Sequence, residues 1–242
     1  MYALITIYFW LYFIITSLVL LPIGATIRLF TYHSDKSLAK LHRFTAFWGL
    51  VFIWGNPLWR FKIEGEENIS PGENFVMISN HQSMIDIFIL YQLKHQYKWV
   101  AKAELFKTPF FGQALSLNKY IKLERTNRSS MIKMMRHADQ VLNDFCSVMI
   151  FPEGTRSKTG EIGNFKDGAF KLALESGKRI LPIVLDKTAD SLPKKGFVFN
   201  KTEPFIVKVL PPVETAGTEQ KELMQRCRQL MINELEQMRQ KS

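Results

Sequence analysis

The stretch Phe75-Val76-Met77-Ile78-Ser79-Asn80-His81-Gln82-Ser83-Met84-Ile85-Asp86 joins one apolar run to a second, residues 87–93. The pattern predicts a buried strand followed by a helix. Five residues at about 100° each would separate His81 and Asp86 by roughly 140° on a regular helix, so they would not share a face. We therefore expect His81 in the turn before the helix and Asp86 in its first turns. This junction would lie at the C-terminal edge of a strand, where open α/β sheets bind ligands.

Two kinds of role are open to this histidine and carboxylate. Together they form a base that takes a proton from a hydroxyl group. Ser83 followed by Asp86 also fits a capping box, which would make Asp86 a helix-start residue only. A histidine beside an apolar strand also occurs as a hydrogen-bonded structural residue. The remaining segments have to decide between these interpretations.

Length, charge and cysteine content limit the class of protein. A chain of 242 residues can bury one core and carry an appended element. Two cysteines, Cys146 and Cys227, do not form a disulfide framework, and we expect reduced thiols facing the cytosol. The net charge of +10 favours an anionic partner, and the surplus lies mostly between residues 36 and 218. Since no basic segment is interleaved with aromatic residues, we predict no nucleic-acid partner. No metal site and no bound cofactor are predicted.

The N-terminus is apolar over a length that exceeds a bilayer crossing. Residues 1–27 contain no charged side chain, although Pro22 and Gly24 interrupt the run. A second apolar stretch, residues 44–59, follows a polar turn in which Ser34 or Asp35 would cap the helix. The sequence therefore predicts a two-helix membrane hairpin over residues 1–59 and a second domain over residues 60–242.

The hairpin prediction has an alternative. Trp48, Trp54 and Trp59 are candidates for anchors at the membrane interface, whether the hairpin enters one leaflet or spans the bilayer. A pair of helices buried in a soluble core would give the same apolar runs.

The domain after residue 60 alternates between strand and helix patterns. Strands are expected near residues 60–64, 75–78, 98–101, 120–123, 148–151, 180–185 and 205–209. This order predicts an α/β fold with a mixed, largely parallel central sheet flanked by helices. Pro182 indicates a sheet edge or a bulge. Residues 218–240 form a predicted covering helix with an apolar stripe through Leu223, Leu230 and Leu235.

Basic side chains follow two of these strands. Arg125 comes after residues 120–123, and Arg156 belongs to the loop Pro152-Glu153-Gly154-Thr155-Arg156-Ser157 after residues 148–151. A guanidinium group at a strand end can hold a phosphate through two parallel hydrogen bonds. The loop continues through two glycines and Lys166, which suits an anion cradle before a helix. It lacks the P-loop and dinucleotide patterns, so a nucleotide hydrolase is not predicted.

Residues 102–112 place exposed aromatic side chains beside lysines. Pro109 ends a short helix there and is followed by Phe110 and Phe111. Such a surface suits contact with acyl chains and anionic headgroups. An ordinary packed turn has the same composition.

Four ordered blocks resemble the glycerolipid acyltransferase family, and most closely its 1-acylglycerol-3-phosphate acyltransferases. They are Asn80-His81-Gln-Ser-Met-Ile-Asp86, Leu123-Glu124-Arg125, Phe151-Pro152-Glu153-Gly154-Thr155-Arg156-Ser157 and Leu181-Pro182-Ile183. The segment 102–112 also resembles that branch. Two departures are visible: the chain has no glycine shortly before Arg125, and Glu124 stands where an aspartate is common.

The resemblance implies a glycerol-3-phosphate acyltransferase-like fold and acyl transfer from a thioester to the sn-2 hydroxyl of lysophosphatidic acid. His81 would be the general base and Asp86 would orient it, while Arg125 and Arg156 would bind the acceptor phosphate. Glu153 would hold the glycerol part or anchor Arg125, and Gly154 and Thr155 would shape the pocket, with amides near Gly154 facing the oxyanion. Contacts to the donor are expected from these residues: Lys102, Phe110, Lys166 and Pro182.

The resemblance leaves several points open. The donor is acyl-CoA or acyl-acyl-carrier-protein, used as a co-substrate. Other acceptors, such as a lysocardiolipin or a lyso-aminolipid, remain alternatives, as do a hydrolase or transacylase and a non-catalytic lipid-binding protein. An acyl-enzyme would need Ser83 or Cys146 as its nucleophile, so direct attack is expected instead. The expected location is the cytoplasmic membrane, with the active site on its cytoplasmic side.

Overall fold

The structure is a computed structural model in which residues 1–124, 128–192, 198–200 and 203–240 are described. Its helices and strands, in chain order, are α1 (Tyr2–Phe30), α2 (Ala39–Trp54), β1 (Phe61–Glu64), η1 (Glu66–Asn68), β2 (Val76–Ser79), α3 (Ile85–Leu90), β3 (Tyr97–Lys102), η2 (Ala103–Lys107), α4 (Phe111–Leu117), β4 (Ile121–Leu123), α5 (Arg128–Asp144), β5 (Ser147–Ile150), α6 (Gly168–Ser176), β6 (Ile180–Asp186), α7 (Thr188–Ser191), β7 (Phe205–Val209) and α8 (Gln220–Gln240).

The described strands form one seven-stranded sheet in the order β1-β7-β6-β2-β5-β3-β4. Strands β6, β2, β5, β3 and β4 run parallel to one another. Only the pairing of β7 with β6 is antiparallel among these strands, and β1 runs parallel to β7. The mixed, largely parallel sheet predicted from the sequence is therefore confirmed. Its five parallel strands end at one edge, where the loops after β2, β5 and β6 meet.

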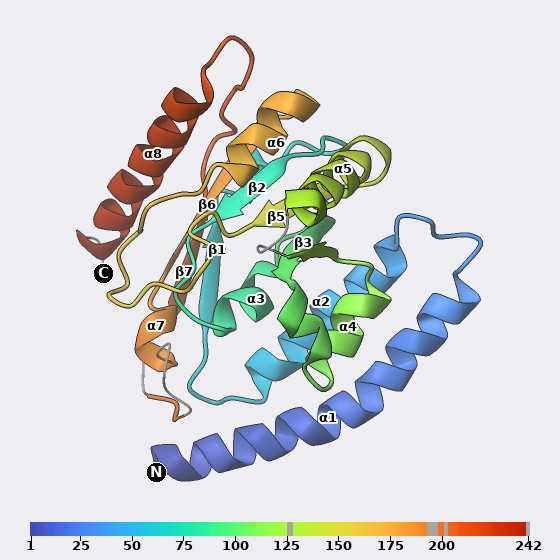
Figure 1. The fold of residues 1–242 in the computed structure, drawn as a ribbon. Helices are drawn as coiled ribbons and strands as arrows, with labels where there is room; N and C mark the ends of the chain where they lie inside the picture. Colours follow the sequence, from blue (N-terminus) through green and yellow to red (C-terminus); the bar gives the residue numbers. More distant parts are fainter. Residues whose placement is uncertain (125–127, 193–197, 201–202, 241–242) are drawn as a thin grey trace.

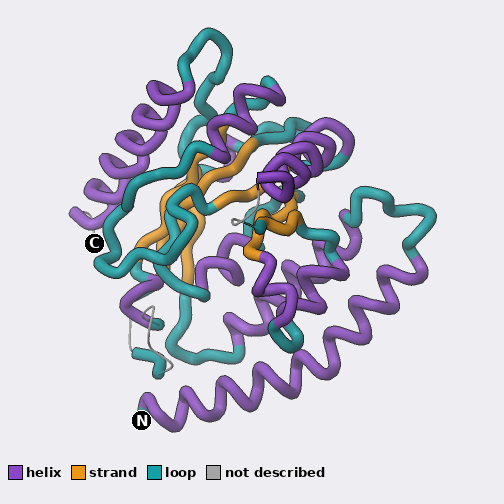
Figure 2. Tube along the Cα trace, in the orientation of Figure 1, coloured by secondary structure: helices purple, strands orange, loops and turns teal. Residues whose placement is uncertain are grey.

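Helices cover both faces of the sheet, which makes the fold a three-layer arrangement (Figures 1 and 2). Successive side chains of β2 point to opposite faces of the sheet. Met77 packs in the core beneath α2, α3 and α4, whereas Val76 and Ile78 pack in the core beneath α5, α6 and α8. Both faces of β2 are apolar because both are buried, as expected for a central parallel strand.

The covering helix α8 packs on β6 and α6. Leu223 and Leu235 of the predicted stripe are buried, but Leu230 is 40% exposed, so that part of the prediction is wrong. The buried positions follow a spacing of four residues through Cys227 and Met231 instead. A cysteine and a methionine thus complete the stripe that leucine spacing alone did not reveal.

The two N-terminal helices are present, and they differ in burial. Asp35 caps α2, since its carboxylate accepts hydrogen bonds from the backbone amides of Ala39 (2.9 Å) and Lys40 (2.7 Å). Pro22 and Gly24 do not end α1, which continues to Phe30. Helix α2 shares a buried core with the sheet, whereas α1 keeps most of its side chains at the surface.

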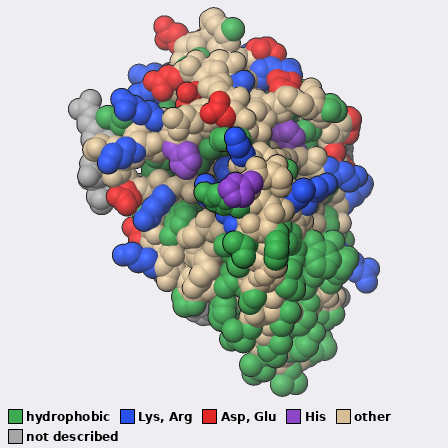
Figure 3. All heavy atoms as spheres, turned by 90° about the vertical axis from the view of Figure 1, so that its right-hand side faces the viewer, with side chains coloured by type: hydrophobic (Ala, Val, Ile, Leu, Met, Phe, Trp, Pro, Cys, Tyr) green, Lys and Arg blue, Asp and Glu red, His purple; other side chains and the backbone are tan. Residues whose placement is uncertain are grey.

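Helix α1 is attached to the body along one side. Phe9 is buried with its ring 4.9 Å from those of Trp59 and Phe199. The Tyr12 hydroxyl donates to the carbonyl of Val51 at 3.0 Å. The opposite side of α1 is exposed, and Figure 3 shows hydrophobic side chains gathered over the lower part of one face with Lys and Arg side chains above them. The exposed apolar residues of α1 include Leu4, Ile7, Leu11, Ile14, Ile15, Leu18 and Val19.

The three tryptophans predicted as interfacial anchors also differ in their exposure. Trp54 is 66% exposed, but Trp48 and Trp59 are buried, so the prediction fails for these two. Trp59 donates its indole N–H to the Ser191 hydroxyl at 2.8 Å, inside the molecule. Trp48 lies in the core because α2 packs against α3, and Trp59, which follows α2, because its ring packs against Phe9 and Phe199.

Pro182 lies within β6, between β7 and β2, so the predicted sheet edge is wrong. The alternative, a bulge, agrees with the register. Ile183 pairs with Val209, whereas Ile180 bridges to Val213, which is an offset of one residue across Pro182. The proline carbonyl still accepts a hydrogen bond from the amide of Leu210 at 2.9 Å.

Candidate active site

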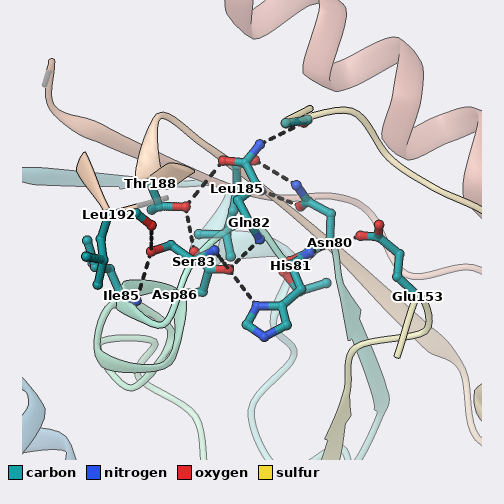
Figure 4. Close-up of polar contacts among 12 residues, drawn as sticks. Asn80, His81, Gln82, Ser83, Ile85, Asp86, Glu153, Leu185, Thr188 and Leu192 are labelled. Atoms are coloured by element: carbon teal, nitrogen blue, oxygen red, sulfur yellow. Dashed lines mark hydrogen bonds and ion pairs between the residues drawn. The ribbon is translucent and has the colours of Figure 1, made fainter. Parts of the chain in front are cut away.

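Three loops at the C-terminal edge of the sheet bring the predicted catalytic residues together. The loop after β2 carries His81, the loop after β5 carries Glu153, and Thr188 follows β6. Asn80 fixes the first loop to the third, because its side chain donates to the carbonyl of Leu185 (2.9 Å) and accepts from the amide of the same residue (2.8 Å). Figure 4 shows these contacts around His81.

His81 and Asp86 meet as predicted, with His81 in the turn before α3 and Asp86 in its first turn. The distance from His81 Nδ1 to Asp86 Oδ2 is 2.8 Å, and the carboxylate is fully buried. Asp86 Oδ2 also accepts the backbone amides of Gln82 (2.7 Å) and Ser83 (2.9 Å). One carboxylate therefore holds the turn that precedes α3 and also contacts the imidazole, while the catalytic role stays a prediction.

The second oxygen of Asp86 is held from a distant part of the chain. The Thr188 hydroxyl donates to Asp86 Oδ1 at 2.6 Å. Four hydrogen bonds, from the His81 ring, two backbone amides and the Thr188 hydroxyl, fix this buried carboxylate in place. It consequently holds the proton of a neutral imidazole on Nδ1, which leaves Nε2 of His81 as an acceptor.

The His81 ring is packed on one face and open at one edge. It stacks on Phe151 with a centroid distance of 3.9 Å and an interplanar angle of 11°, and Trp99 stacks behind Phe151 at 5.1 Å. The side chain of His81 is 16% exposed. In Figure 4 its second nitrogen points away from Asp86 and the network. Nε2 can thus receive a proton from a bound molecule.

Glu153 connects the catalytic loop to the loop that follows β5. Its Oε1 accepts the backbone amide of His81 (3.0 Å) and its Oε2 that of Gly163 (3.1 Å). Burial raises the pKa of this carboxyl group, although both amides oppose the rise. The sequence offered two roles for Glu153, holding the acceptor or anchoring Arg125. Its contacts with the described residues are to backbone amides of two loops, and both roles stay predictions because Arg125 lies outside those residues.

Replacing Glu153 with Gln is expected to weaken the fold and the site together. A carboxamide presents an NH₂ group to one of the two amide donors, which leaves a buried donor unsatisfied at a cost of about 1–3 kcal/mol. We expect Glu153→Gln to lower the free energy of unfolding in urea by that amount. Glu161→Gln, at an exposed position of the same loop, is the control and should cost less than about 0.5 kcal/mol. Equal losses in the two variants would contradict the role of Glu153.

The predicted phosphate-binding residues are placed only in part. Arg125 lies outside the described residues, but β4, which precedes it, ends at the same edge of the sheet as β2. Arg156 is half-buried and lies beside His81, because the amide of Ser157 donates to the His81 carbonyl at 2.7 Å. Thr155 and Lys166 are exposed in the same loop.

Gly154 is used for a turn. Its φ is 68°, a conformation that favours glycine, and its amide donates to the carbonyl of Phe151 at 2.9 Å. The Gly154 amide itself is therefore engaged within the turn, and an oxyanion role for the neighbouring amides stays a prediction.

The predicted donor contacts lie in different surroundings. Lys102 is exposed at the end of β3, on the edge that carries His81. Pro182 is buried within β6, where a donor has no access. Phe110 lines a small apolar cavity of about 40 Å³ between α1, α2, α3 and α4. Its walls include Phe13, Trp48, Gly49, Phe52, Phe88, Phe111 and Ala114.

Neither candidate nucleophile is suited to an acyl-enzyme. The hydroxyl of Ser83 is buried and donates to the carbonyl of Leu192 at 2.8 Å. Burial raises the pKa of the Cys146 thiol to about 11, so it is protonated at neutral pH. Among the described residues, no group of three His, Cys, Asp or Glu side chains is arranged to hold a metal ion.

Sequence reasoning did not find two of the residues that hold the base. Thr188 is 102 positions from Asp86 in the chain, and no local pattern connects them. Phe151 reads as one more apolar residue of a buried strand, and its place under the imidazole follows only from the pairing of β2 with β5.

An imidazole oriented by a buried carboxylate, at the C-terminal edge of a largely parallel sheet, has the geometry of a general base in an α/β fold. The chain belongs to the acyltransferase family, whose sequence profile matches residues 60–186.

Several relatives match most of the chain. It is 36% identical over 161 residues to a chloroplastic 1-acyl-sn-glycerol-3-phosphate acyltransferase of Arabidopsis thaliana, covering 66% of this chain and 45% of that protein. It is 34% identical over 160 residues to the alpha form of the enzyme of that name from Mus musculus, covering 65% and 56%. The chain thus spans about half the length of the curated relatives it matches.

A solved structure matches nearly the whole fold. The crystal structure of the 1-acyl-sn-glycerophosphate (LPA) acyltransferase from Thermotoga maritima superposes with a TM-score of 0.80 at 25% identity, covering 98% of this chain and 95% of that one. The N-terminal helices are therefore included in the similarity.

Proposed function

We propose that the protein transfers a fatty acyl group from a thioester to the sn-2 hydroxyl of lysophosphatidic acid and so forms phosphatidic acid. The observation that carries this proposal is the 2.8 Å contact between His81 and the buried Asp86, beside the loop of Arg156. The relatives of the chain are named for this acyl transfer.

The proposed reaction is direct attack in a ternary complex. Nε2 of His81 takes the proton of the acceptor hydroxyl as its oxygen bonds to the thioester carbonyl carbon. Asp86 stabilises the imidazolium that forms. The tetrahedral intermediate then expels the thiolate, which receives the proton from His81, so the base is regenerated. Ser83 and Cys146 take no part because their side chains are buried.

The acceptor is proposed to bind through its phosphate. Arg156 lies beside His81, and Arg125 follows β4 at the same edge, so two guanidinium groups would hold the phosphate and present the hydroxyl to Nε2. Lys102 and Lys166 carry positive charge at this edge and are proposed to meet the anionic part of acyl-CoA or acyl-acyl-carrier-protein.

A direct assay tests the function. Purified protein is incubated with each thioester donor and with either lysophosphatidic acid or an unphosphorylated monoacylglycerol. The proposal expects phosphatidic acid from lysophosphatidic acid, with a kcat/KM at least about a hundredfold above that of the unphosphorylated acceptor, because an arginine–phosphate pair is bidentate and charge-assisted. Equal rates on the two acceptors, or acyl release without an acceptor, would reject it.

The small apolar cavity between α1 and α4 is proposed to widen on binding and to accept the end of the acyl chain. It borders α3, the helix that begins with the Asp86 turn, and its walls are aromatic and aliphatic. Ala114→Phe would fill part of the cavity and is expected to shift the preference toward shorter chains by at least about tenfold in the kcat/KM ratio. Donors from ten to eighteen carbons measure this shift. Gln113→Phe, at the exposed neighbouring position, is the control, and the same shift there would contradict the assignment.

Helix α1 is the described helix that is long and apolar enough to cross a membrane. We propose that its exposed side meets the lipid that supplies the acceptor, at the cytoplasmic membrane, with the active site on the cytoplasmic side where thioester donors are made and thiols stay reduced.

Deleting residues 1–58 is not a clean test of this proposal, because Trp48 and Phe52 belong to the core. Replacing Leu11, Ile15 and Leu18 with Gln is better, since each is more than half exposed. Each lost apolar side chain is worth about 1.5–3 kcal/mol of burial, so co-sedimentation with phospholipid vesicles should fall more than about a hundredfold. The melting temperature should stay unchanged. Met131→Gln with Ile132→Gln, exposed on α5, should leave sedimentation unaltered.

A further inference from the structure

The C-terminal helix α8 holds the loop that carries the proposed phosphate-binding residues. Residues 151–167 form neither helix nor strand, so other contacts must fix their position. Arg228 donates to the backbone carbonyls of Gly163 (2.8 Å) and Ile162 (3.1 Å). Arg239 donates to the carbonyl of Gly160 at 3.1 Å.

Both arginines lie on one side of α8. They are eleven residues apart, which at about 100° per residue comes within roughly 20° of three full turns. The spacing therefore lets one helix hold the loop at two points about 16 Å apart along its axis. Each guanidinium binds backbone carbonyls, so the contact fixes the path of the loop rather than the identity of its side chains.

From each of these two loop contacts a chain of hydrogen bonds leads to His81 or to its partner Asp86. The Gly160 carbonyl that receives Arg239 also receives the side-chain amide of Gln82, at 3.0 Å. Gln82 is buried and its own backbone amide donates to Asp86. Gly163, held by Arg228 through its carbonyl, donates its amide to Glu153, which binds the amide of His81.

Arg239 has two further contacts. It pairs with the exposed Glu161 (2.6 Å), and its Nε lies 3.5 Å from the buried carboxylate of Asp186. Asp186 ends β6, two residues before Thr188, the donor to Asp86. An exposed ion pair contributes little to global stability, so the contact with Glu161 does not explain this cluster.

We propose that Arg228 and Arg239 are positioning residues, which set the affinity for the phosphate-bearing acceptor by fixing residues 154–167 against the His81 loop. This inference rests on the proposed function and adds the C-terminal helix to the determinants of acceptor binding. Neither arginine touches the reacting atoms. Loss of either leaves the base in place and lets Arg156 move.

Two variants distinguish a positioning role of the arginines from an effect of their charge and from a loss of folded protein. Arg228→Gln removes the guanidinium group that binds the backbone carbonyls of Ile162 and Gly163. Arg239→Lys keeps a cation near Asp186 but loses the planar fork that reaches the Gly160 carbonyl and Glu161 together. Arg226→Gln, at an exposed position of the same helix, is the matched control.

The first measurement is amide hydrogen exchange of the full-length protein, which does not depend on activity. Peptides from residues 154–167 should exchange at least about tenfold faster in Arg228→Gln and Arg239→Lys than in the wild type or in Arg226→Gln. Peptides from β2 and β5 should be unchanged. Unchanged protection of the loop in both variants would overturn the inference, as would an equal increase over the whole protein.

The second measurement compares Michaelis constants. The KM for lysophosphatidic acid should rise about tenfold in both variants, while kcat and the KM for the thioester stay within about twofold. A purely structural role would lower kcat, through loss of folded protein, and leave both KM values unchanged, and that result would overturn the inference. A wild-type protein without acyl transfer would reject the proposed function, and the exchange data alone would then decide about the two arginines.

Discussion

Replacing His81 with Ala is expected to lower kcat by about 10²–10⁴-fold, the range that a positioned general base contributes. The acceptor hydroxyl would then have no base within reach, since Asp86 is fully buried and Glu153 faces backbone amides. Both KM values should change little, because His81 accepts the hydroxyl proton during the reaction and binds neither the phosphate nor the acyl chain. Single-turnover kinetics with lysophosphatidic acid measure the effect on chemistry directly.

The fold should survive this substitution. Asp86 keeps the amides of Gln82 and Ser83 and the Thr188 hydroxyl, so no buried carboxylate loses all its partners. His137→Ala, at an exposed histidine on α5, is the matched control and should retain full activity. Normal turnover by a folded His81→Ala protein would end the assignment of the base.

Asp86→Asn is expected to affect both activity and stability. The carboxamide cannot accept three hydrogen bonds on one atom and would turn its NH₂ group toward amide donors or toward Thr188. One buried mismatch costs about 1–3 kcal/mol, which for a domain of this size lowers the melting temperature by roughly 2–12 °C. Without the carboxylate, the proton of the neutral His81 ring is no longer held on Nδ1, so kcat should fall by about 10³–10⁴-fold.

Thr188→Val gives a graded comparison. It removes only the donor to Asp86 Oδ1 and leaves the contact with His81. We expect about a tenfold loss of kcat, since a hydrogen bond to a charged group is worth about 1.5–3 kcal/mol and part of it is recovered by local adjustment. Calorimetry and steady-state kinetics check both variants. An Asp86→Asn protein with the activity of Thr188→Val would contradict the orienting role of the carboxylate.

Much of this architecture follows from local pattern. The alternation and length of apolar runs predicted every strand to within a few residues, because strands buried on both faces are continuous apolar segments. The His81 junction was predictable for the same reason: a five-residue separation allows contact only across the start of a helix, and the contact forms there. Asp35 could be predicted as a cap because capping is local to the chain.

The errors come from contacts between distant segments. Trp48 and Trp59 are apolar and aromatic whether they face lipid or the core. Only contacts with distant segments bury them: α3 for Trp48, and Phe9 and Phe199 for Trp59. Glu153 was predicted to hold the acceptor or to anchor Arg125, but no local pattern predicted its two backbone-amide partners, which lie in the loops after β2 and β5. Such partners are set by topology and have no signature in the sequence.

The attachment of α1 has a consequence for how this enzyme approaches a lipid surface. The buried ring of Phe9 and the hydrogen bond from the Phe199 amide to the Thr6 hydroxyl (3.0 Å) join α1 to the same body that holds the catalytic histidine. If α1 is the membrane anchor, as proposed, the anchor and the imidazole move together as one body. The distance of the imidazole from the bilayer would then be set by the fold, and a lysolipid acceptor would have to reach that fixed distance to react.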